Sequence, residues 1–230
     1  MHQTITIDGP SGSGKSTVSR MLAEALGFLY LDTGAMYRAA ALAAVRSSVH
    51  FDDGPALAAL CTVIDLHFRN MDGVWRIHLG DEDVSDAIRT PGMDKASSQI
   101  SAVREVRQAL MVLQREIGRS ASVVAEGRDM GTVVSPEARY KFFLEAPAET
   151  RALRRYLERQ ANGEEAELEE VVRAMKERDE RDSTREIAPL KPAPGAVIIE
   201  TARLTPSGVV SAMMEHMGLA APGSAPGKQG

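Results

Sequence analysis

Short apolar runs alternate with longer amphipathic segments along most of this chain. The runs predict buried strands, and apolar residues recurring every three or four positions predict helices. The expected strands cover 4–8, 28–31, 122–125, 140–144 and 196–199. The expected helices cover 15–26, 35–45, 57–64, 103–117, 168–175 and 206–217. An opening of strand, loop, helix and strand is typical of an α/β fold with a parallel sheet flanked by helices.

One stretch breaks this pattern. Apolar residues alternate with polar ones in 64–68 and again in 75–79, on either side of the turn-forming segment 70–73. That period indicates an antiparallel hairpin with one exposed face. We therefore expect a kinase-like core formed by 1–64 and 102–218, an inserted β subdomain at 65–101, and a disordered Gly/Pro/Ala/Ser-rich tail at 219–230.

Composition narrows the possible settings of the protein. The 230 residues are 43% hydrophobic and 26% charged, with a net charge of −5, which disfavours a general nucleic-acid or membrane-surface role. No apolar run reaches membrane-spanning length, and the N-terminus enters a strand without a signal-peptide core. The single cysteine, Cys61, lies in an apolar helical stretch and is interpreted as a packing residue. We expect a cytoplasmic protein.

A phosphate-binding loop joins the first strand to the first helix. Residues 9–16 read Gly-Pro-Ser-Gly-Ser-Gly-Lys-Ser and match the pattern G-x-x-x-x-G-K-[ST]. Glycines let several backbone N–H groups face one anion, and the helix adds its positive N-terminal end. Lys15 is expected to reach the β- and γ-phosphates and Ser16 to hold Mg²⁺. The predicted nucleotide-binding residues are Gly9, Pro10, Ser11, Gly12, Ser13, Gly14, Lys15, Ser16 and Thr17.

This loop alone does not separate a switch GTPase, a motor ATPase and a small-molecule kinase, but two arginine-bearing segments help. Residues 32–38 follow the second strand and 126–132 follow the third. Ligands of an open parallel sheet lie beyond the C-terminal ends of its strands. Arg38 and Arg128 are therefore expected to converge on the cleft of the phosphate loop. The alternative is two surface arginines in ordinary connecting segments.

The charged end of the 168–185 segment carries a third candidate group. Its apolar stripe consists of Leu168, Val171, Val172 and Met175. Continuing the stripe in steps of three and four residues reaches Arg178, Asp182 and Arg185, which are predicted to face inward. The solvated face is then expected to hold Asp179, Glu180 and Arg181.

A fourth group of arginines follows the strand that ends near residue 145. It consists of Arg151, Arg154, Arg155 and Arg159. These side chains are interpreted either as a lid, spanning about 151–170, that closes over phosphates, or as an ordinary helix surface.

Several of these segments together resemble the cytidylate kinase family of nucleoside monophosphate kinases. The matching pieces are TIDGPSGSGKST, LDTGAMYR, the hairpin region, ASSQISA, VREVRQAL, AEGRDMGTVV, and KERDERDSTR followed by APL. They extend from residue 4 to about 190. Thr33 stands where many relatives carry serine, which preserves a hydroxyl group.

The resemblance implies an ATP-binding core, a CMP-binding insert and a short lid. It implies phosphoryl transfer from ATP with Mg²⁺, acceptors CMP and dCMP, a role in pyrimidine nucleotide metabolism, and a monomer that binds neither nucleic acid nor membrane. The cytosine would be surrounded by Thr33, Ser98, Arg107, Asp129 and Arg185. The acceptor phosphate would be held by Arg38 and Arg128, and the sugar by Arg178 and Asp182. Lys15, Arg128 and Arg178 would carry catalysis, with the lid arginines Arg151, Arg154 and Arg155.

Three other classes of function stay open at the level of the residues. A kinase for another nucleotide or small metabolite would share the phosphate loop. A P-loop switch or regulatory module would hydrolyse slowly and need no acceptor, which the arginine-rich segments disfavour. A nucleic-acid-binding protein is disfavoured by the isoelectric point near 5.6.

Overall fold

A computed structural model describes residues 2–71 and 73–220 of the chain. Within them, five parallel strands form a central sheet in the spatial order β2-β6-β1-β7-β8. The strands are Thr4–Asp8 (β1), Leu29–Asp32 (β2), Val123–Gly127 (β6), Tyr140–Glu145 (β7) and Val197–Glu200 (β8). The expected parallel α/β fold is confirmed, and each predicted strand is present to within one or two residues.

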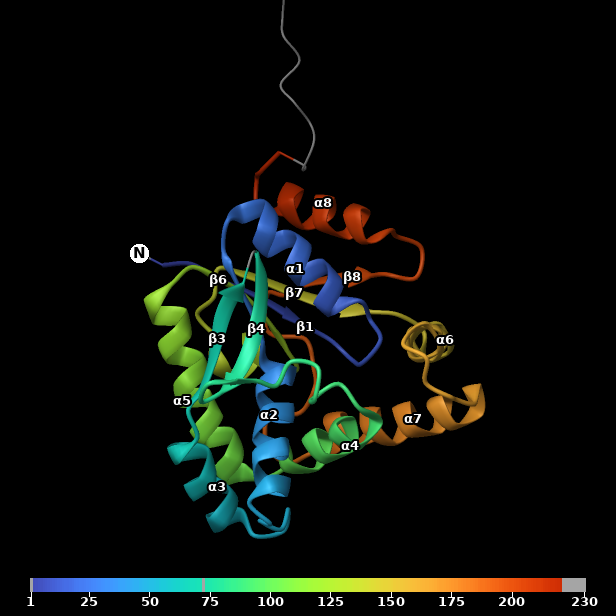
Figure 1. Cartoon of the computed structure of the whole chain (residues 1–230). Helices are drawn as coiled ribbons and strands as arrows, with labels where there is room; N and C mark the ends of the chain where they lie inside the picture. Colours follow the sequence, from blue (N-terminus) through green and yellow to red (C-terminus); the bar gives the residue numbers. More distant parts are fainter. Residues whose placement is uncertain (1, 72, 221–230) are drawn as a thin grey trace, which may run out of the picture.

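Helices cover both faces of this sheet (Figure 1). The helices are Lys15–Leu26 (α1), Thr33–Arg46 (α2), Gly54–Val63 (α3), Pro91–Ile100 (α4), Arg104–Ser120 (α5), Ala148–Ala161 (α6), Leu168–Thr184 (α7) and Pro206–His216 (α8). A short π-helical segment, η1, covers Met130–Val134. The sequence pattern did not predict helices α4 and α6 as separate elements.

Two apolar clusters fill the spaces between the sheet and its helices. On one face, α1 and α8 pack on side chains such as Ile5, Ile7 and Phe142. On the other face, α2 and η1 pack on Leu31 and Ala125. Strand residues therefore alternate between two buried faces, which is why the strands read as nearly continuous apolar runs.

The predicted hairpin is confirmed and gains a third strand. Leu66–Met71 (β3) pairs antiparallel with Val74–Leu79 (β4), and β4 pairs with Glu82–Asp83 (β5). Ile77 of β4 packs in the cluster beneath α2, while the half-buried Trp75 packs against the cluster of α1 and α8. The small sheet is thus joined to apolar clusters from both sides of the central sheet.

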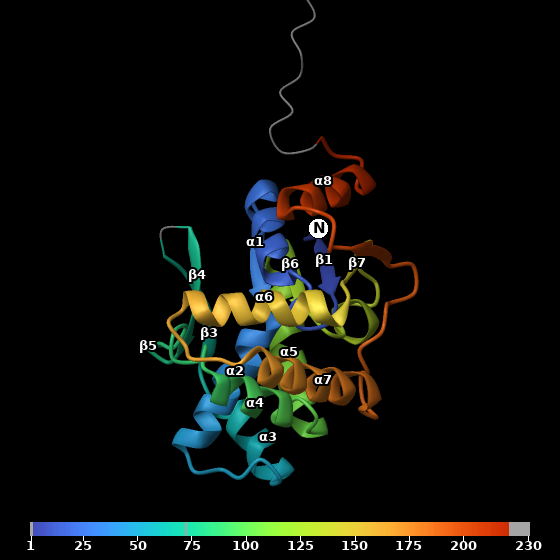
Figure 2. The ribbon, with the colours of Figure 1, turned by 90° about the vertical axis from the view of Figure 1, so that its right-hand side faces the viewer.

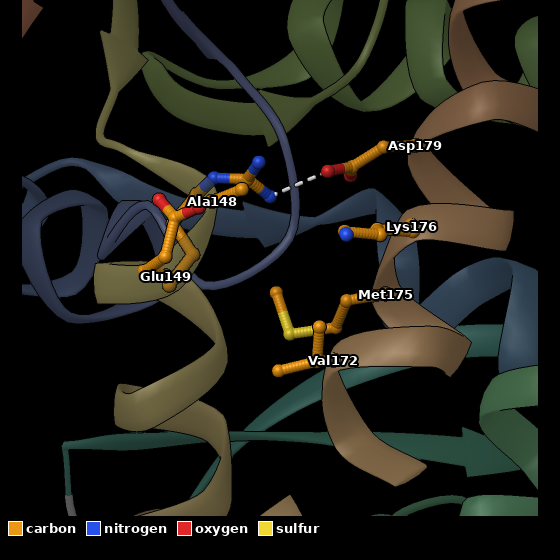
Figure 3. Close-up of a pocket in the computed structure, with 7 residues that line it drawn as sticks. Ala148, Glu149, Val172, Met175, Lys176 and Asp179 are labelled. Carbon is orange, nitrogen blue, oxygen red and sulfur yellow. Dashed lines mark ion pairs between the residues drawn. The ribbon is translucent and has the colours of Figure 1, made fainter. Parts of the chain in front are cut away.

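Helices α6 and α7 form a separate pair beside the C-terminal edge of the central sheet (Figure 2). Ala152 of α6 packs on Val171 and Met175 of α7. A small cavity of about 50 Å³ lies between the two helices (Figure 3). Arg151 and Asp179, which form an ion pair at 2.7 Å, are among the residues that line it. A space of this size holds a water or two, so it is a packing gap rather than a nucleotide site.

Most of the predicted disordered tail lies outside the described residues, because the structure describes the chain only to residue 220. Cys61 packs against the buried cluster formed by α2, α3, α4 and α5, and burial raises the pKa of its thiol to about 11. Its interpretation as a packing residue agrees with this position. No helix within 2–71 and 73–220 is long and apolar enough to cross a membrane.

Candidate active site

A pocket with a volume of about 600 Å³ lies at the C-terminal edge of the central sheet. Its walls bring together the segments that follow β1, β2, β6 and β8, and the helices α4, α6 and α7. Residues lining it include Ser11, Gly12, Ser13, Gly14, Lys15, Ser16, Thr17, Asp32, Arg38, Asp94, Glu126, Arg128, Arg154, Arg155, Arg178, Thr201 and Leu204. Such a volume is of the size that small-molecule sites require.

Two glycines of the phosphate loop are needed by the shape of the chain around it. Gly9 has φ +150°, and a Cβ there would stand 2.1 Å from the carbonyl oxygen of Leu144. Gly12 has φ +74°, and its Cβ would stand 2.8 Å from the carbonyl oxygen of Arg151. Neither position has room for a side chain. The loop is therefore held between β7 and the start of α6.

Lys15 begins α1 and is directed back over the loop. Its Nζ donates to the carbonyl oxygen of Pro10 at 2.6 Å and lies 3.5 Å from Oγ of Ser13. Burial and the positive charge of Arg128 lower the pKa of Lys15 well below its ordinary value. A phosphate bound here would relieve both effects, so the loop is arranged for an anionic ligand.

Oxygen ligands suited to Mg²⁺ collect beside the loop. Oγ of Ser16 donates to Oε2 of Glu126 at 3.1 Å, and Asp32 lines the same pocket. Burial and the negative charge of Asp32 raise the pKa of Glu126. A cation between the two carboxylates would relieve this repulsion. The described residues hold no group of three His, Cys, Asp or Glu side chains placed to bind a metal. Mg²⁺ in proteins commonly combines one or two protein oxygens with waters and phosphate oxygens.

Four arginines from different elements meet across the pocket from the loop. Arg38 of α2, Arg155 of α6 and Arg178 of α7 surround the carboxylate of Asp94, which belongs to α4. Arg128, just after β6, is held instead by Asp182: its Nε donates to Oδ2 at 2.8 Å. The predicted convergence of Arg38 and Arg128 on the cleft of the phosphate loop is therefore observed, and Arg178 joins them.

The inward face predicted for the charged end of α7 is observed. The side chains of Asp182 and Arg185 are 6% and 7% exposed, and that of Arg178 is 18% exposed. Two residues assigned to the solvated face differ from expectation. Asp179 pairs with Arg151 at 2.7 Å, and Nε of Arg181 donates to Ser98 at 3.1 Å, so both connect α7 to neighbouring elements. The spacing rule missed them because long side chains reach around a helix.

The residues expected around the cytosine form a buried group that does not line the pocket. Arg107 pairs with Asp129 and also donates to the carbonyl oxygen of Ser101 at 2.9 Å, while its guanidinium lies over the ring of Tyr37. Thr33 donates to the carbonyl oxygen of Glu126 at 2.6 Å. The members of this group are Thr33, Ser98, Arg107, Asp129 and Arg185; Asp182, which was expected at the sugar, does not line the pocket either.

The arginines of the fourth group take different positions. Arg154 and Arg155 line the pocket, and Arg154 donates to the carbonyl oxygen of Thr201 at 2.7 Å. Arg151 lies behind the phosphate loop and donates to the carbonyl oxygen of Ser11 at 3.1 Å. Arg159 pairs with Glu164 at 2.9 Å and does not line the pocket.

The sequence interpretation missed Glu126 and Asp94 as residues of the site. Glu126 ends a buried strand immediately before the Gly127-Arg128 pair, and the rule that placed Arg128 at the strand end applies to it equally. Asp94 carries no comparable signal, because helix α4 was not separated from the rest of the insert.

Comparison with known proteins adds independent findings. The family model described as "Cytidylate kinase" matches residues 5–218. A protein of Geobacter sulfurreducens with that name is 47% identical over 209 residues, covering 91% of this chain and 90% of its own. A Pasteurella multocida protein of the same name is 45% identical over 213 residues, covering 93% and 94%. An uncharacterized protein from Eubacterium ventriosum shares the fold with TM-score 0.51 and 13% identity, over 95% of this chain and 99% of its own.

Proposed function

This chain belongs to the cytidylate kinase family, and on that premise we propose that it transfers the γ-phosphoryl group of ATP to CMP and dCMP. The products are ADP and CDP or dCDP. The observation that carries the proposal is the meeting of two cationic groups in one pocket. The phosphate loop with Lys15 stands on one side, and Arg38, Arg128 and Arg178 stand on the other. A transfer between two anions needs such a pair of groups, whereas a switch that only hydrolyses needs one.

The donor nucleotide is assigned to the side of the phosphate loop. Its phosphates follow the backbone N–H groups of 9–16, with Lys15 at the β- and γ-phosphates. Leu204, Pro206 and Val209 line the pocket where α8 begins, beside Thr17 and Arg154. We assign the adenine to these apolar side chains.

Mg²⁺ is assigned to the same side, with Ser16 as its direct protein ligand. Glu126 accepts a hydrogen bond from Ser16, and we assign to Glu126 and Asp32 the waters around the ion. When bound, the ion would neutralise negative charge that develops on the phosphoryl group during transfer.

The acceptor is assigned to the opposite side. Arg38 and Arg128 hold its phosphate, and Arg178 and Asp182 contact its sugar. The cytosine is recognised by the buried group that consists of Thr33, Ser98, Arg107, Asp129 and Arg185. Arg107 with Asp129 presents a donor and an acceptor together, which suits the edge of a cytosine that carries both. For the base to enter, the ion pair between Arg107 and Asp129 must open, because each side chain now holds the other.

In the reaction itself, an oxygen of the CMP phosphate forms a bond to the γ-phosphorus of ATP. The bond from that phosphorus to the bridging oxygen of ADP breaks as the new one forms, in line with it. No side chain is needed as a nucleophile. Lys15, Arg128 and Arg178 offset the charge spread over the equatorial oxygens, and Arg154 and Arg155 of α6 exclude water as the lid closes.

The proposal also divides the chain into three functional parts. We assign 1–64 and 102–218 to the core, about 151–170 to the lid and 65–101 to the acceptor-binding insert. We expect the protein to act as a monomer in the cytoplasm on free nucleotides.

An ATP-consumption assay coupled to ADP formation tests the proposal. The acceptors are CMP, dCMP, UMP, AMP and shikimate, each at a range of concentrations. We expect the highest kcat/KM with CMP and substantial activity with dCMP. A higher kcat/KM with AMP or shikimate would show that CMP is not the preferred acceptor. ADP formation that is independent of any acceptor would show that the protein is a hydrolase rather than a kinase.

A further inference from the structure

The carboxylate of Asp94 is enclosed by arginines from three other helices. Its Oδ1 is 2.9 Å from Nε of Arg38 and 3.8 Å from Nη1 of Arg178, and its Oδ2 contacts Nη2 of Arg155. The side chain of Asp94 is only 20% exposed. Helices α2, α6 and α7 are thereby tied through one anion to the first turn of α4.

The Asp94 carboxylate balances the positive charges of three arginines that have few other ion-pair partners. In the part of the chain that the structure describes, the ion pairs of Arg38 and Arg178 are with Asp94, and Arg155 has Glu158 in addition. Burial raises the pKa of Asp94, but the charges of Arg38, Arg155 and Arg178 more than offset that effect and leave it below its ordinary value. The carboxylate is therefore ionised wherever the protein is folded near neutral pH.

The same arginines face the phosphate loop across the pocket, and Asp94 lines that pocket with them. A carboxylate offers them two oxygens and one negative charge. A phosphate monoester offers three oxygens and up to two negative charges, in the same kind of charge-assisted hydrogen bond. The Asp94 carboxylate and a bound phosphate cannot both contact Nε of Arg38 and Nη1 of Arg178 at the same time.

We propose that Asp94 is an internal competitor for the acceptor phosphate, whose carboxylate fills the arginine cluster in the empty enzyme and is displaced when the acceptor binds. This inference rests on the proposed function, since it takes the acceptor phosphate to bind at Arg38, beside the arginines of the sugar site and the lid, Arg178 and Arg155, that share the same carboxylate. Asp94 then keeps three guanidinium groups together against their mutual repulsion. It also makes the site selective: inorganic phosphate must displace the carboxylate unaided, whereas CMP adds the contacts of its base and sugar.

The inference is tested by binding of inorganic phosphate and of CMP, measured separately by calorimetry on the full chain. Asp94→Asn keeps the shape of the side chain and removes the charge. We expect both ligands to bind the variant roughly 10- to 100-fold more tightly, the range for one charge-assisted contact. KM for CMP should fall, while KM for ATP stays within about twofold because the donor side is separate.

Glu158→Gln is the matched control. It removes one charge from a residue that lines the same pocket and contacts Arg155 at 2.8 Å, but this side chain is 56% exposed and is not enclosed. Its effect on phosphate affinity should be below about threefold, as is usual for exposed pairs. Asp94→Glu keeps the charge and should stay near wild type. If thermal melting shows that Asp94→Asn does not fold, Asp94→Ser is used in its place, since it also removes the charge and has a smaller side chain.

Equal effects of Asp94→Asn and Glu158→Gln would overturn the inference, because they would reflect only the general field of the pocket. Weaker binding of phosphate to Asp94→Asn would also overturn it, because Asp94 would then be building the site. If the wild type does not phosphorylate CMP, the proposed function fails on its own, and the titration with inorganic phosphate still decides whether Asp94 competes.

Discussion

Removing the carboxylate of Asp182 should damage both the stability and the activity of the enzyme. Asp182 lies on the inward face of α7 with its side chain 6% exposed, and it accepts a hydrogen bond from Nε of Arg128 at 2.8 Å. Nη1 of Arg185 lies 3.9 Å from its other oxygen. Asp182→Ala therefore leaves two arginines without their shared anion in a place that water barely reaches.

The magnitude follows from that burial. Removing one partner of a buried ion pair costs about 3–5 kcal/mol, because the other charge is left uncompensated. Arg128 is 18% exposed and can recover some hydration, so we take the lower end, about 3 kcal/mol. For a domain of this size each kcal/mol shifts Tm by roughly 2–4 °C, which gives a decrease of about 6–12 °C.

The effect on catalysis adds to this loss. Arg128 would no longer be held toward the acceptor phosphate, and the sugar would lose a hydrogen-bond acceptor. One charge-assisted contact corresponds to roughly a ten- to hundredfold lower kcat/KM for CMP. Paired kinetics on CMP and dCMP identify the contact. Equal losses on both are expected from the release of Arg128 or from a contact with the 3′-hydroxyl, and a larger loss on CMP than on dCMP indicates the 2′-hydroxyl.

Glu180→Ala is the control, because Glu180 is an exposed residue of the same helix. It should change Tm and kcat/KM little. If Asp182→Ala melts like the wild type and keeps its kcat/KM on both acceptors, the reasoning from burial and ion pairing is refuted.

Three further changes have defined outcomes. Lys15→Met should leave a folded protein without transfer activity, and retention of more than roughly a tenth of wild-type kcat would contradict its role at the phosphates. Arg107→Met should raise KM for CMP roughly tenfold or more and leave KM for ATP nearly unchanged, since Arg107 pairs with Asp129 away from the phosphate loop; equal changes would remove it from the acceptor site. Burial raises the pKa of Asp8 from 3.8 to about 6. Folded Asp8 thus holds its proton more tightly than unfolded Asp8, and its contribution to the unfolding free energy should fall by about 3 kcal/mol as pH rises through this window. Urea unfolding of the wild type and Asp8→Asn between about pH 4 and 7 measures this, and a constant difference between them would refute it.

Local pattern predicted the elements of the central sheet well, because both of its faces are buried and its strands are consequently apolar. The inward face of α7 also followed from spacing, since Asp182 and Arg185 continue the buried stripe of Val171 and Met175. The first residue predicted for that stripe, Leu168, is instead 40% exposed. A helix rotates by a fixed angle per residue, so its buried face can be extended beyond the last apolar side chain.

Contacts between distant segments could not be predicted in the same way. Asp94 meets Arg38, Arg155 and Arg178 across separations of 56, 61 and 84 residues, and no local pattern marks such a partner. The start of α2 was also placed late. Asp32 caps this helix by accepting from the backbone N–H of Ala35 at 2.8 Å, so the helix begins at Thr33 rather than near residue 35.

The position of Trp75 makes its intrinsic fluorescence a probe of the small antiparallel sheet. It is the only tryptophan of the chain, and it lies in the small antiparallel sheet while packing against the apolar cluster that contains Val18 and Leu22 of α1. An indole in such a place emits at shorter wavelength than one in water. If the small sheet moves when an acceptor binds, titration with CMP will shift this emission without any attached label, and a constant spectrum through saturation would show that the contact stays closed. Separate titrations with CMP and with an ATP analogue would show which of the two ligands changes the surroundings of Trp75.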